Sequence, residues 1–317
     1  MVNHISRHNI SMSEFWTNTV WYIALGATSA VSIIIMFIRS KVRKKLFAFW
    51  FGVLGFTYML EACLVLLFNA YTYHPMMRPE DPFFDAVLGN IFSQVSVSSS
   101  AVLICVLGLS NWWLAGFSAA YFMIDVLYVH LGVYEHFWYQ SVFTLGGFFL
   151  YGLIVKWWYK RMVGGFAKWL YYATLFLSVF AVTTNIVGTA LKLLDLRVFQ
   201  ASFYSDLSKN HTVVVLIYGY VLIIIMIALY KWKSPWWQKA FVFLLLLVCQ
   251  WGLLQSGVII VRPGWGIFIM LFDLILFFGW TVIMDRYLQG KSKQYQSPWN
   301  GVASPFLAHT NVRHGKR

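Results

Sequence analysis

The sequence predicts an all-α fold: a polytopic transmembrane helical bundle of about nine helices, with its N-terminus outside the cell and its C-terminus in the cytoplasm. Three observations predict it. Of the 317 residues, 60% are hydrophobic and 11% are charged, whereas soluble globular proteins are ~25% charged. The apolar residues form long blocks, and the basic residues lie in the short segments between them.

Nine apolar blocks are expected to span the membrane, because ~20 residues at ~1.5 Å per residue cross its hydrocarbon core. They form a transmembrane domain over 1–287. The remaining residues, 288–317, are polar and basic, and we expect a disordered cytoplasmic tail. The predicted spans are 15–38, 46–70, 87–109, 113–132, 141–158, 169–194, 213–230, 240–261 and 266–285.

The distribution of Lys and Arg predicts the orientation. With the N-terminus outside, eighteen of the 24 basic residues fall in cytoplasmic segments and six fall outside, as the positive-inside rule requires. The net charge of +13 therefore reflects topology. The expected partner is the lipid bilayer, and nucleic acid is not expected.

Three carboxylates fall inside predicted spans: Glu61, Asp125 and Asp273. A charged side chain in a bilayer costs ~2.5–3.5 kcal/mol, so function is the default hypothesis for each of them. All three lie in the outer half of the membrane, Asp125 and Asp273 ~11 Å and Glu61 ~14 Å below its surface. The other candidates for this polar layer are Asn90, Gln94, His130, Asn185, Lys192 and Gln255.

This polar layer predicts an outward-opening cavity in which the three carboxylates meet. Clustered acids repel one another, so at least one is expected to hold a proton near neutrality. A structural alternative stays open. Polar side chains also hold membrane helices together, at ~0.6 kcal/mol each, and a carboxylate could form a plain salt bridge, for instance with Lys192.

The segment after the fourth span concentrates polar and aromatic residues, and we expect it to pack over the polar layer at the outer interface. Its spacing of acids and histidines matches no established metal motif. The three cysteines lie in separate apolar blocks and are expected to be small buried hydrophobes. The sequence thus predicts no metal site and identifies no cofactor. The candidate residues of this outer loop are Tyr134, Glu135, His136 and Trp138.

No long internal repeat is evident. The clearest internal similarity is between Tyr58-Met-Leu-Glu61 in the second span and Phe122-Met-Ile-Asp125 in the fourth, since both place a carboxylate after an aromatic residue. These spans run in the same direction, so the similarity is compatible with a parallel duplication.

About a third of the chain contains short motifs that resemble those of a known protein family. The residues are Tyr58-Met-Leu-Glu61, Ala70-Tyr-Thr-Tyr73, Leu88-Gly-Asn90, Ser93-Gln94 and Gly132-Val-Tyr-Glu-His-Phe-Trp138 with Tyr139. The region from Tyr58 to Trp158 resembles an uncharacterised family of multi-pass membrane proteins from spore-forming Gram-positive bacteria. The resemblance implies a bacterial plasma membrane and no particular reaction.

Three functions remain open. The first is binding or transport of a small solute or ion, linked to a proton, which the buried carboxylates favour. Against it, no pair of Gly- or Pro-broken spans occurs in matching positions. The second is a sensor or an assembly subunit whose polar layer binds another membrane protein. A lipid-modifying enzyme ranks third, because neither paired acidic motifs nor histidine boxes lie on the cytoplasmic side.

Overall fold

The computed structural model describes residues 15–205 and 207–289. In these ranges nine helices are long and apolar enough to cross a membrane, and each coincides with a predicted span. The all-α fold is thereby confirmed. Most of the predicted tail, 290–317, lies outside the described residues, whereas 288 and 289 belong to the last helix.

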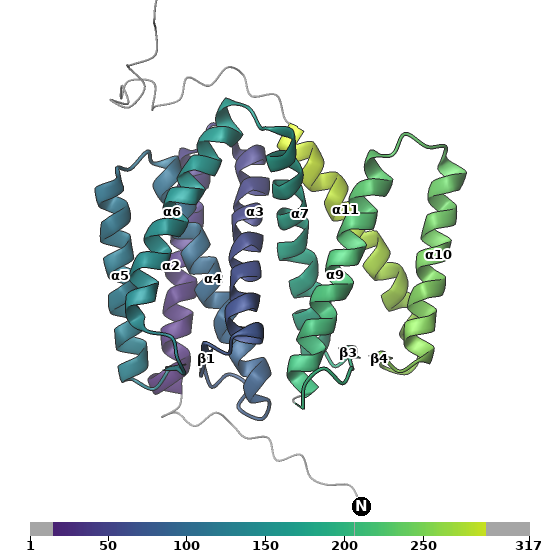
Figure 1. The fold of residues 1–317 in the computed structure, drawn as a ribbon, viewed down its shortest axis with the longest axis horizontal. Coiled ribbons are helices and arrows are strands. Elements are labelled where there is room, and N and C mark those ends of the chain that lie inside the picture. Colours follow the sequence, from purple (N-terminus) through teal and green to yellow (C-terminus); the bar gives the residue numbers. More distant parts are fainter. Residues whose placement is uncertain (1–14, 206, 290–317) are drawn as a thin grey trace, which may run out of the picture.

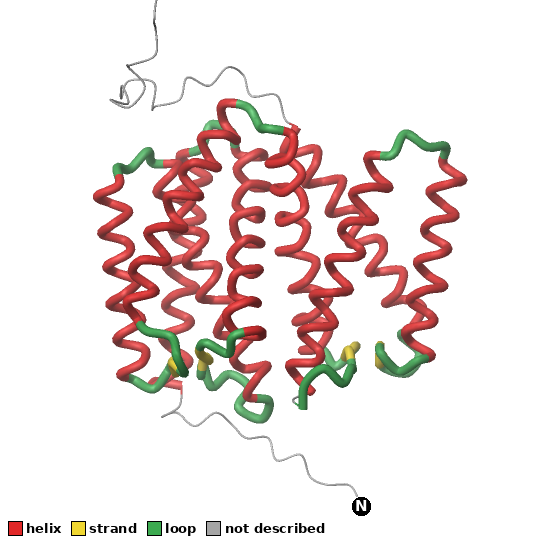
Figure 2. Tube along the Cα trace, viewed as in Figure 1, coloured by secondary structure: helices red, strands yellow, loops and turns green. Residues whose placement is uncertain are grey.

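The elements follow one another along the bundle, with the helices roughly side by side and four short strands at one end (Figures 1 and 2). In chain order they are the π-helical segment η1 (Phe15–Thr19), α2 (Val20–Arg39), α3 (Arg43–Ala62), the π-helical segment η2 (Cys63–Leu67), β1 (Tyr71–Tyr73), α4 (Pro82–Val106), α5 (Asn111–His130), β2 (Tyr134–His136), α6 (Ser141–Gly164), α7 (Lys168–Thr184), the π-helical segment η3 (Asn185–Ala190), α8 (Leu191–Leu193), β3 (Arg197–Phe199), α9 (Leu207–Lys231), α10 (Trp236–Gln255), β4 (Ile259–Val261) and α11 (Gly266–Gln289).

Four predicted boundaries differ from the structure by five or six residues: the start of the third span, the end of the fifth, the start of the seventh and the end of the eighth. Two of these differences have a clear local cause. The third span begins at Pro82 rather than at 87, because Asp81 caps the helix by accepting a hydrogen bond of 3.1 Å from the backbone N–H of Phe84. The eighth span ends at Gln255 rather than at 261. Gly257, with φ +76°, turns the chain out of the helix, and the next apolar residues form β4.

The bundle contains the same order of elements twice, over 43–164 and 168–289. Each unit runs helix, π-helical segment, strand, two helices, strand and helix, and the second unit adds the short α8. Corresponding helices begin 125 residues apart (43 and 168, 82 and 207, 111 and 236, 141 and 266). With four spans each, both units run in the same direction, which makes this a parallel repeat.

The strands repeat with the helices. In both units the strand after the first helix pairs antiparallel with the strand after the third, so Tyr73 faces Tyr134 in one unit and Phe199 faces Ile259 in the other. The sequence similarity around Glu61 and Asp125 therefore does not reflect the repeat, because both residues belong to the first unit. The repeat relates α3 to α7, not α3 to α5.

The two units meet along α3 and α7, which lie next to each other in the middle of the bundle (Figure 1). Gly55 permits this approach: a Cβ atom there would lie 2.0 Å from the carbonyl oxygen of Leu177. Helix α2 stands outside the repeat and packs against α4. The part of the chain that the structure describes thus consists of one additional long helix and two similar four-span units.

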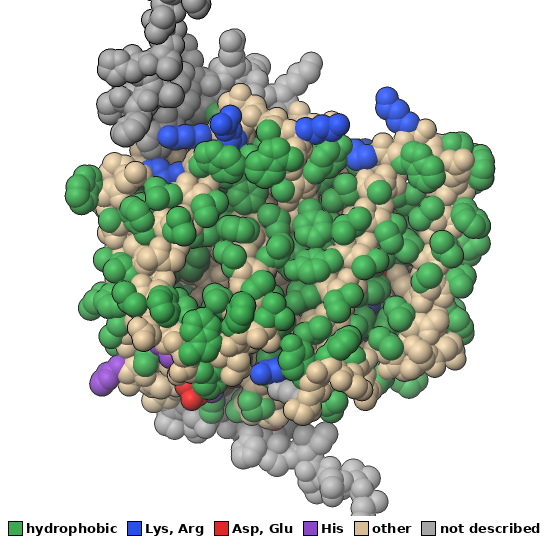
Figure 3. All heavy atoms as spheres, viewed as in Figure 1, with side chains coloured by type: hydrophobic (Ala, Val, Ile, Leu, Met, Phe, Trp, Pro, Cys, Tyr) green, Lys and Arg blue, Asp and Glu red, His purple; other side chains and the backbone are tan. Residues whose placement is uncertain are grey.

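The two ends of the bundle differ in charge. Lys and Arg side chains gather at the end opposite the strands, where α6 connects to α7 and α9 to α10 (Figure 3). Hydrophobic side chains cover the face of the bundle seen in Figure 3 between its two ends. We call the two ends the basic end and the strand end.

Candidate functional site

A cavity of about 230 Å³ lies between α2 and the helices of the first unit, toward the strand end, and we call it the tyrosine cavity. Helices α2 to α6 and strands β1 and β2 all contribute side chains to it. Besides Glu61 and Asp125, its lining includes Thr57, Ser93, Gln94 and Thr144. Eight tyrosines line it: Tyr22, Tyr71, Tyr73, Tyr121, Tyr128, Tyr134, Tyr139 and Tyr151.

Glu61 is held in this cavity by strand β1. Tyr71 donates a hydrogen bond of 2.5 Å to one carboxylate oxygen, and Tyr73 donates one of 3.1 Å to the other. Residues two apart in a strand project from the same face, which is why both hydroxyls reach one acid. Burial raises the pKa of Tyr71 and of Tyr73 well above the ordinary value, so both hydroxyls keep their protons. Glu61 itself is 4% exposed.

Asp125 lies in the same cavity on α5 and has its own partners. His136 Nε2 lies 3.0 Å from one carboxylate oxygen, and Thr144 donates a hydrogen bond of 2.6 Å to the other. Tyr139 and Thr144 share a further hydrogen bond of 3.1 Å. Strand β2 and the start of α6 thereby fix the second acid, as β1 fixes the first.

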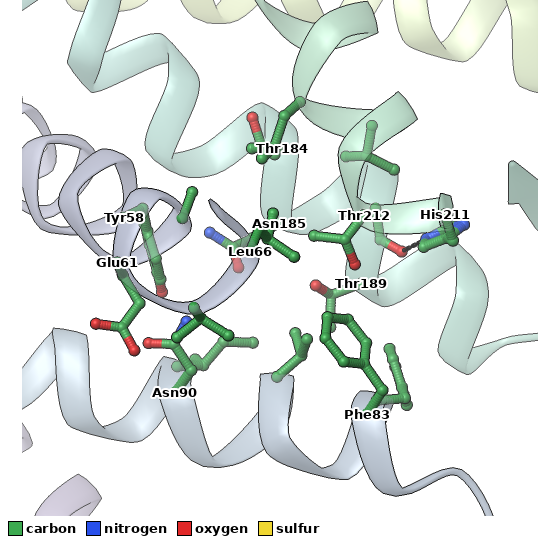
Figure 4. A pocket seen from close by; sticks show the side chains of 18 of the residues that line it. Tyr58, Glu61, Leu66, Phe83, Asn90, Thr184, Asn185, Thr189, His211 and Thr212 are labelled. Atoms are coloured by element: carbon green, nitrogen blue, oxygen red, sulfur yellow. Dashed lines mark hydrogen bonds between the residues drawn. The ribbon is translucent and has the colours of Figure 1, made fainter. Parts of the chain in front are cut away.

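A second cavity, of about 100 Å³, lies between the two units, and we call it the interface cavity. Figure 4 shows Tyr58 and Glu61 on one side, Thr212 and His211 on the other, and Asn185 between them. Both π-helical segments contribute to its wall, through 65 and 66 of η2 and 185, 188 and 189 of η3. π-helical turns inside α-helices are frequent at functional sites.

Polar atoms in this interface cavity are incompletely satisfied. Within the described residues, Asn90 Oδ1 and Thr184 Oγ1 are buried and have no hydrogen-bond partner, and both residues line the cavity. Buried polar atoms are normally paired with protein or with ordered water. The interface cavity can therefore accept further hydrogen bonds from water or from a solute.

Glu61 is the residue that the linings of the two cavities share. The tyrosine cavity adds Asp125, and the interface cavity adds His211 and the unpaired oxygen of Asn90. The buried carboxylate of Glu61 thus lies between the tyrosine cavity and the interface cavity.

The third predicted carboxylate is elsewhere. Asp273, in α11, pairs with Arg197 and accepts a hydrogen bond of 2.6 Å from Tyr218, and it lines neither of the two cavities. The prediction that all three carboxylates share one chamber is wrong, because equal depth in the membrane does not determine lateral position. Arg197 and Asp273 are both buried and form an ion pair within the second unit.

The remaining predicted residues divide into three groups. Asn90 and Asn185 line the interface cavity, and Gln94 lines the tyrosine cavity. Lys192 forms a salt bridge of 2.9 Å with Asp81 in a loop, not with a carboxylate of the layer. The prediction fails for His130 and Gln255, which are exposed and line neither of these cavities.

The predicted loop after α5 does pack over the tyrosine cavity. Tyr134 lines it, and His136 contacts Asp125. Trp138 donates a hydrogen bond of 2.7 Å to the carbonyl of Phe68, which ties the loop to the end of η2. Glu135 faces away and lies 3.2 Å from His74.

Sequence reasoning missed the tyrosines that bind Glu61 and a buried glutamine. The alternation Ala70-Tyr-Thr-Tyr73, directly after the helix that carries Glu61, was the available signal for a strand with two aromatic residues on one face. Gln250 occupies in α10 the place of Asp125 in α5, 125 residues earlier. Both of its amide atoms are buried without a partner among the described residues.

In the described ranges no group of three His, Cys, Asp or Glu side chains is arranged to hold a metal ion. No family model, no curated protein and no solved structure matches this chain. The function has to be inferred from the chemistry of the two cavities.

Proposed function

We propose that this protein transports a small solute or ion, which binds in the tyrosine cavity and passes by Glu61 into the interface cavity as two steps of the transport cycle. The observation that carries the proposal is that Glu61 lines both cavities. An ionisable residue buried within membrane-spanning helices marks a solute, ion or proton pathway by default. In the proposed transport cycle, Glu61 also binds and releases a proton, so that movement of the solute is linked to a proton.

The repeat supports the same function. In transporters built from repeated units, binding sites lie where the units meet, and movement of one unit against the other alternates access. Here the interface cavity lies between the units, beside η2 and η3. Gly55 lets α3 and α7 approach closely there. Interrupted α-helical hydrogen bonding in η2 and η3 offers a place for the helices to bend.

We propose that the strand end faces the outside and the basic end faces the cytoplasm of a bacterial plasma membrane. The eighteen-to-six division of basic residues supports this orientation. Exposed indole rings also lie where α5 and α10 begin, at the basic end, as expected for rings at a membrane interface. They belong to Trp112, Trp113, Trp236 and Trp237.

Reconstitution into proteoliposomes tests the proposed function. Currents or tracer uptake are measured with a panel of small cationic, anionic and uncharged solutes. At least one class is expected to move through the wild-type protein. Glu61→Gln, which keeps the shape of the side chain but removes its charge, is expected to abolish that movement.

The matched control is Glu80→Gln, since Glu80 is an exposed loop residue beside Arg78. It makes the same chemical change and should leave transport unaltered. Movement that survives Glu61→Gln unchanged, or a wild-type protein that moves no solute of any class, would overturn the proposal.

A further inference from the structure

We infer that the tyrosine cavity recognises an organic ammonium ion, a small amine or a quaternary ammonium compound, through its tyrosine rings and the carboxylates of Glu61 and Asp125. The inference rests on the proposed function and specifies its substrate class.

Charge is the first argument. The described lining of the tyrosine cavity contains two carboxylates and neither Lys nor Arg. Asp125 has His136 beside it, 3.0 Å away, but the side chains that bind Glu61 are the neutral hydroxyls of Tyr71 and Tyr73. A buried carboxylate is costly unless a cation compensates it. A cationic ligand in the cavity would supply that compensation.

The aromatic walls are the second argument. The rings of Tyr71, Tyr73 and Tyr134 lie against one another, with centroids 4.8 Å apart for Tyr73 and Tyr134 and 5.0 Å apart for Tyr71 and Tyr134. Strands β1 and β2 hold these rings in register. Aromatic faces attract cations, and cages of such rings bind quaternary ammonium groups.

The lining also argues against a bare metal ion. Calcium takes six to eight oxygen ligands, and magnesium takes six. In the described part of the cavity, the charged oxygens come only from Glu61 and Asp125, among rings and aliphatic side chains. A volume of about 230 Å³ is also far larger than a bare ion needs. A bulky cation with apolar substituents can interact both with the two carboxylates and with the tyrosine rings of the cavity.

The test uses three compounds of similar shape and different charge. Choline is the cation, 3,3-dimethylbutan-1-ol is its uncharged isostere, and pivalate is an anion with the same branched group. Binding to the purified full-length protein is measured by calorimetry or thermophoresis at millimolar ligand. Choline is expected to bind at least about tenfold more tightly than either of the others, a difference of about 1.4 kcal/mol.

Variants separate the two contributions. Tyr134→Leu removes the ring and should weaken choline binding by about 3- to 30-fold, whereas Tyr134→Phe keeps the ring and should weaken it much less. Glu61→Gln should weaken choline binding by at least about tenfold and leave the binding of dimethylbutanol unchanged. Glu80→Gln, at an exposed residue that does not line the cavity, is the control for both.

Equal binding of choline and dimethylbutanol, or no binding of choline, overturns the inference. Equal effects of Tyr134→Phe and Tyr134→Leu would also overturn the role of the rings. These failures are distinguishable from a failure of the proposed function. If anionic or uncharged solutes move in proteoliposomes and Glu61→Gln stops them, the function stands and the substrate class is wrong.

Discussion

Tyr71 and Glu61 are joined by a hydrogen bond of 2.5 Å that connects strand β1 to the membrane-spanning helix α3. The strand lies outside the spans, yet it positions the carboxylate that the two cavities share. The short strands are therefore part of the candidate site and not mere connections between helices.

Removing this bond should destabilise the protein. Tyr71→Phe deletes the hydroxyl and is expected to lower the free energy of unfolding by ~1.5–3 kcal/mol, the range for hydrogen bonds to charged groups. Thermal unfolding in detergent measures the change. In a Glu61→Gln background the same substitution should cost less, because the two residues act as a pair. Equal costs in both backgrounds would show that Tyr71 acts through something other than Glu61.

The contact between the units should not tolerate a methyl group. Gly55→Ala would place a Cβ atom 2.0 Å from the backbone of Leu177, and we expect a loss of ~1–3 kcal/mol of stability from overpacking. Gly116→Ala, in α5, is the matched control, because nothing lies within 4 Å of the added atom. It should be neutral or slightly stabilising, since Ala favours helix more than Gly does. Equal stability of the two variants would mean that α3 and α7 are not packed this closely.

The ion pair of the second unit should be structural. Arg197→Met leaves Asp273 buried without its cation and is expected to cost ~3–5 kcal/mol. Adding Asp273→Leu should recover most of that loss, because the uncompensated charge is then gone. If the single variant is as stable as wild type, the pair is not formed in the membrane.

Alkaline pH should loosen the strand end. Burial raises the pKa of Tyr139 from 10.0 to about 12, and it raises the pKa of Tyr134 well above the ordinary value. The folded protein thus holds protons that the unfolded chain loses, so this stability is complete below pH 10.0 and disappears as the pH rises through about 12. Unfolding temperatures measured across this interval should fall, and more gently in Tyr139→Phe. An equally steep fall in that variant would contradict the assignment.

The topology can be tested with a reporter enzyme that is active only outside the cell. A fusion after Met77, between α3 and α4, should be active. Fusions after Ser234 and after Arg317 should be silent, because the distribution of basic residues predicts that both positions are cytoplasmic. The reverse pattern would invert the proposed orientation, and activity after both Met77 and Arg317 would imply an even number of spans.

The sequence predicted the spans well, because a bilayer imposes a length and an apolar composition that each helix satisfies by itself. All nine predicted segments coincide with helices, and the errors lie at the helix ends, as at Asp81, which caps α4, and at Gly257, which ends α10. It did not reveal the repeat. Corresponding positions, such as Asp125 and Gln250 or Tyr134 and Ile259, carry different side chains, although they lie in elements of the same order and spacing.

The candidate site was predicted in part. Burial cost marked Glu61 and Asp125 correctly as residues that need partners, and the loop containing Tyr134 and His136 was correctly expected to lie over them. Asp273 satisfied the same criterion but pairs with Arg197. Depth along a helix can be counted from sequence, whereas the direction in which a side chain points across the bundle cannot.

By itself, then, the sequence determined what each helix had to be: its length, its apolar surface and the few buried charges that require compensation. Only the tertiary structure decided which of the charged side chains lie close together. Glu61 shares a cavity with Asp125 and accepts hydrogen bonds from Tyr71 and Tyr73, because β1 pairs with β2 at the strand end of the first unit. Asp273 meets Arg197 because α11 packs in the second unit. Lateral packing of helices depends on contacts between residues far apart in the chain, such as Gly55 and Leu177, and no local pattern encodes those contacts.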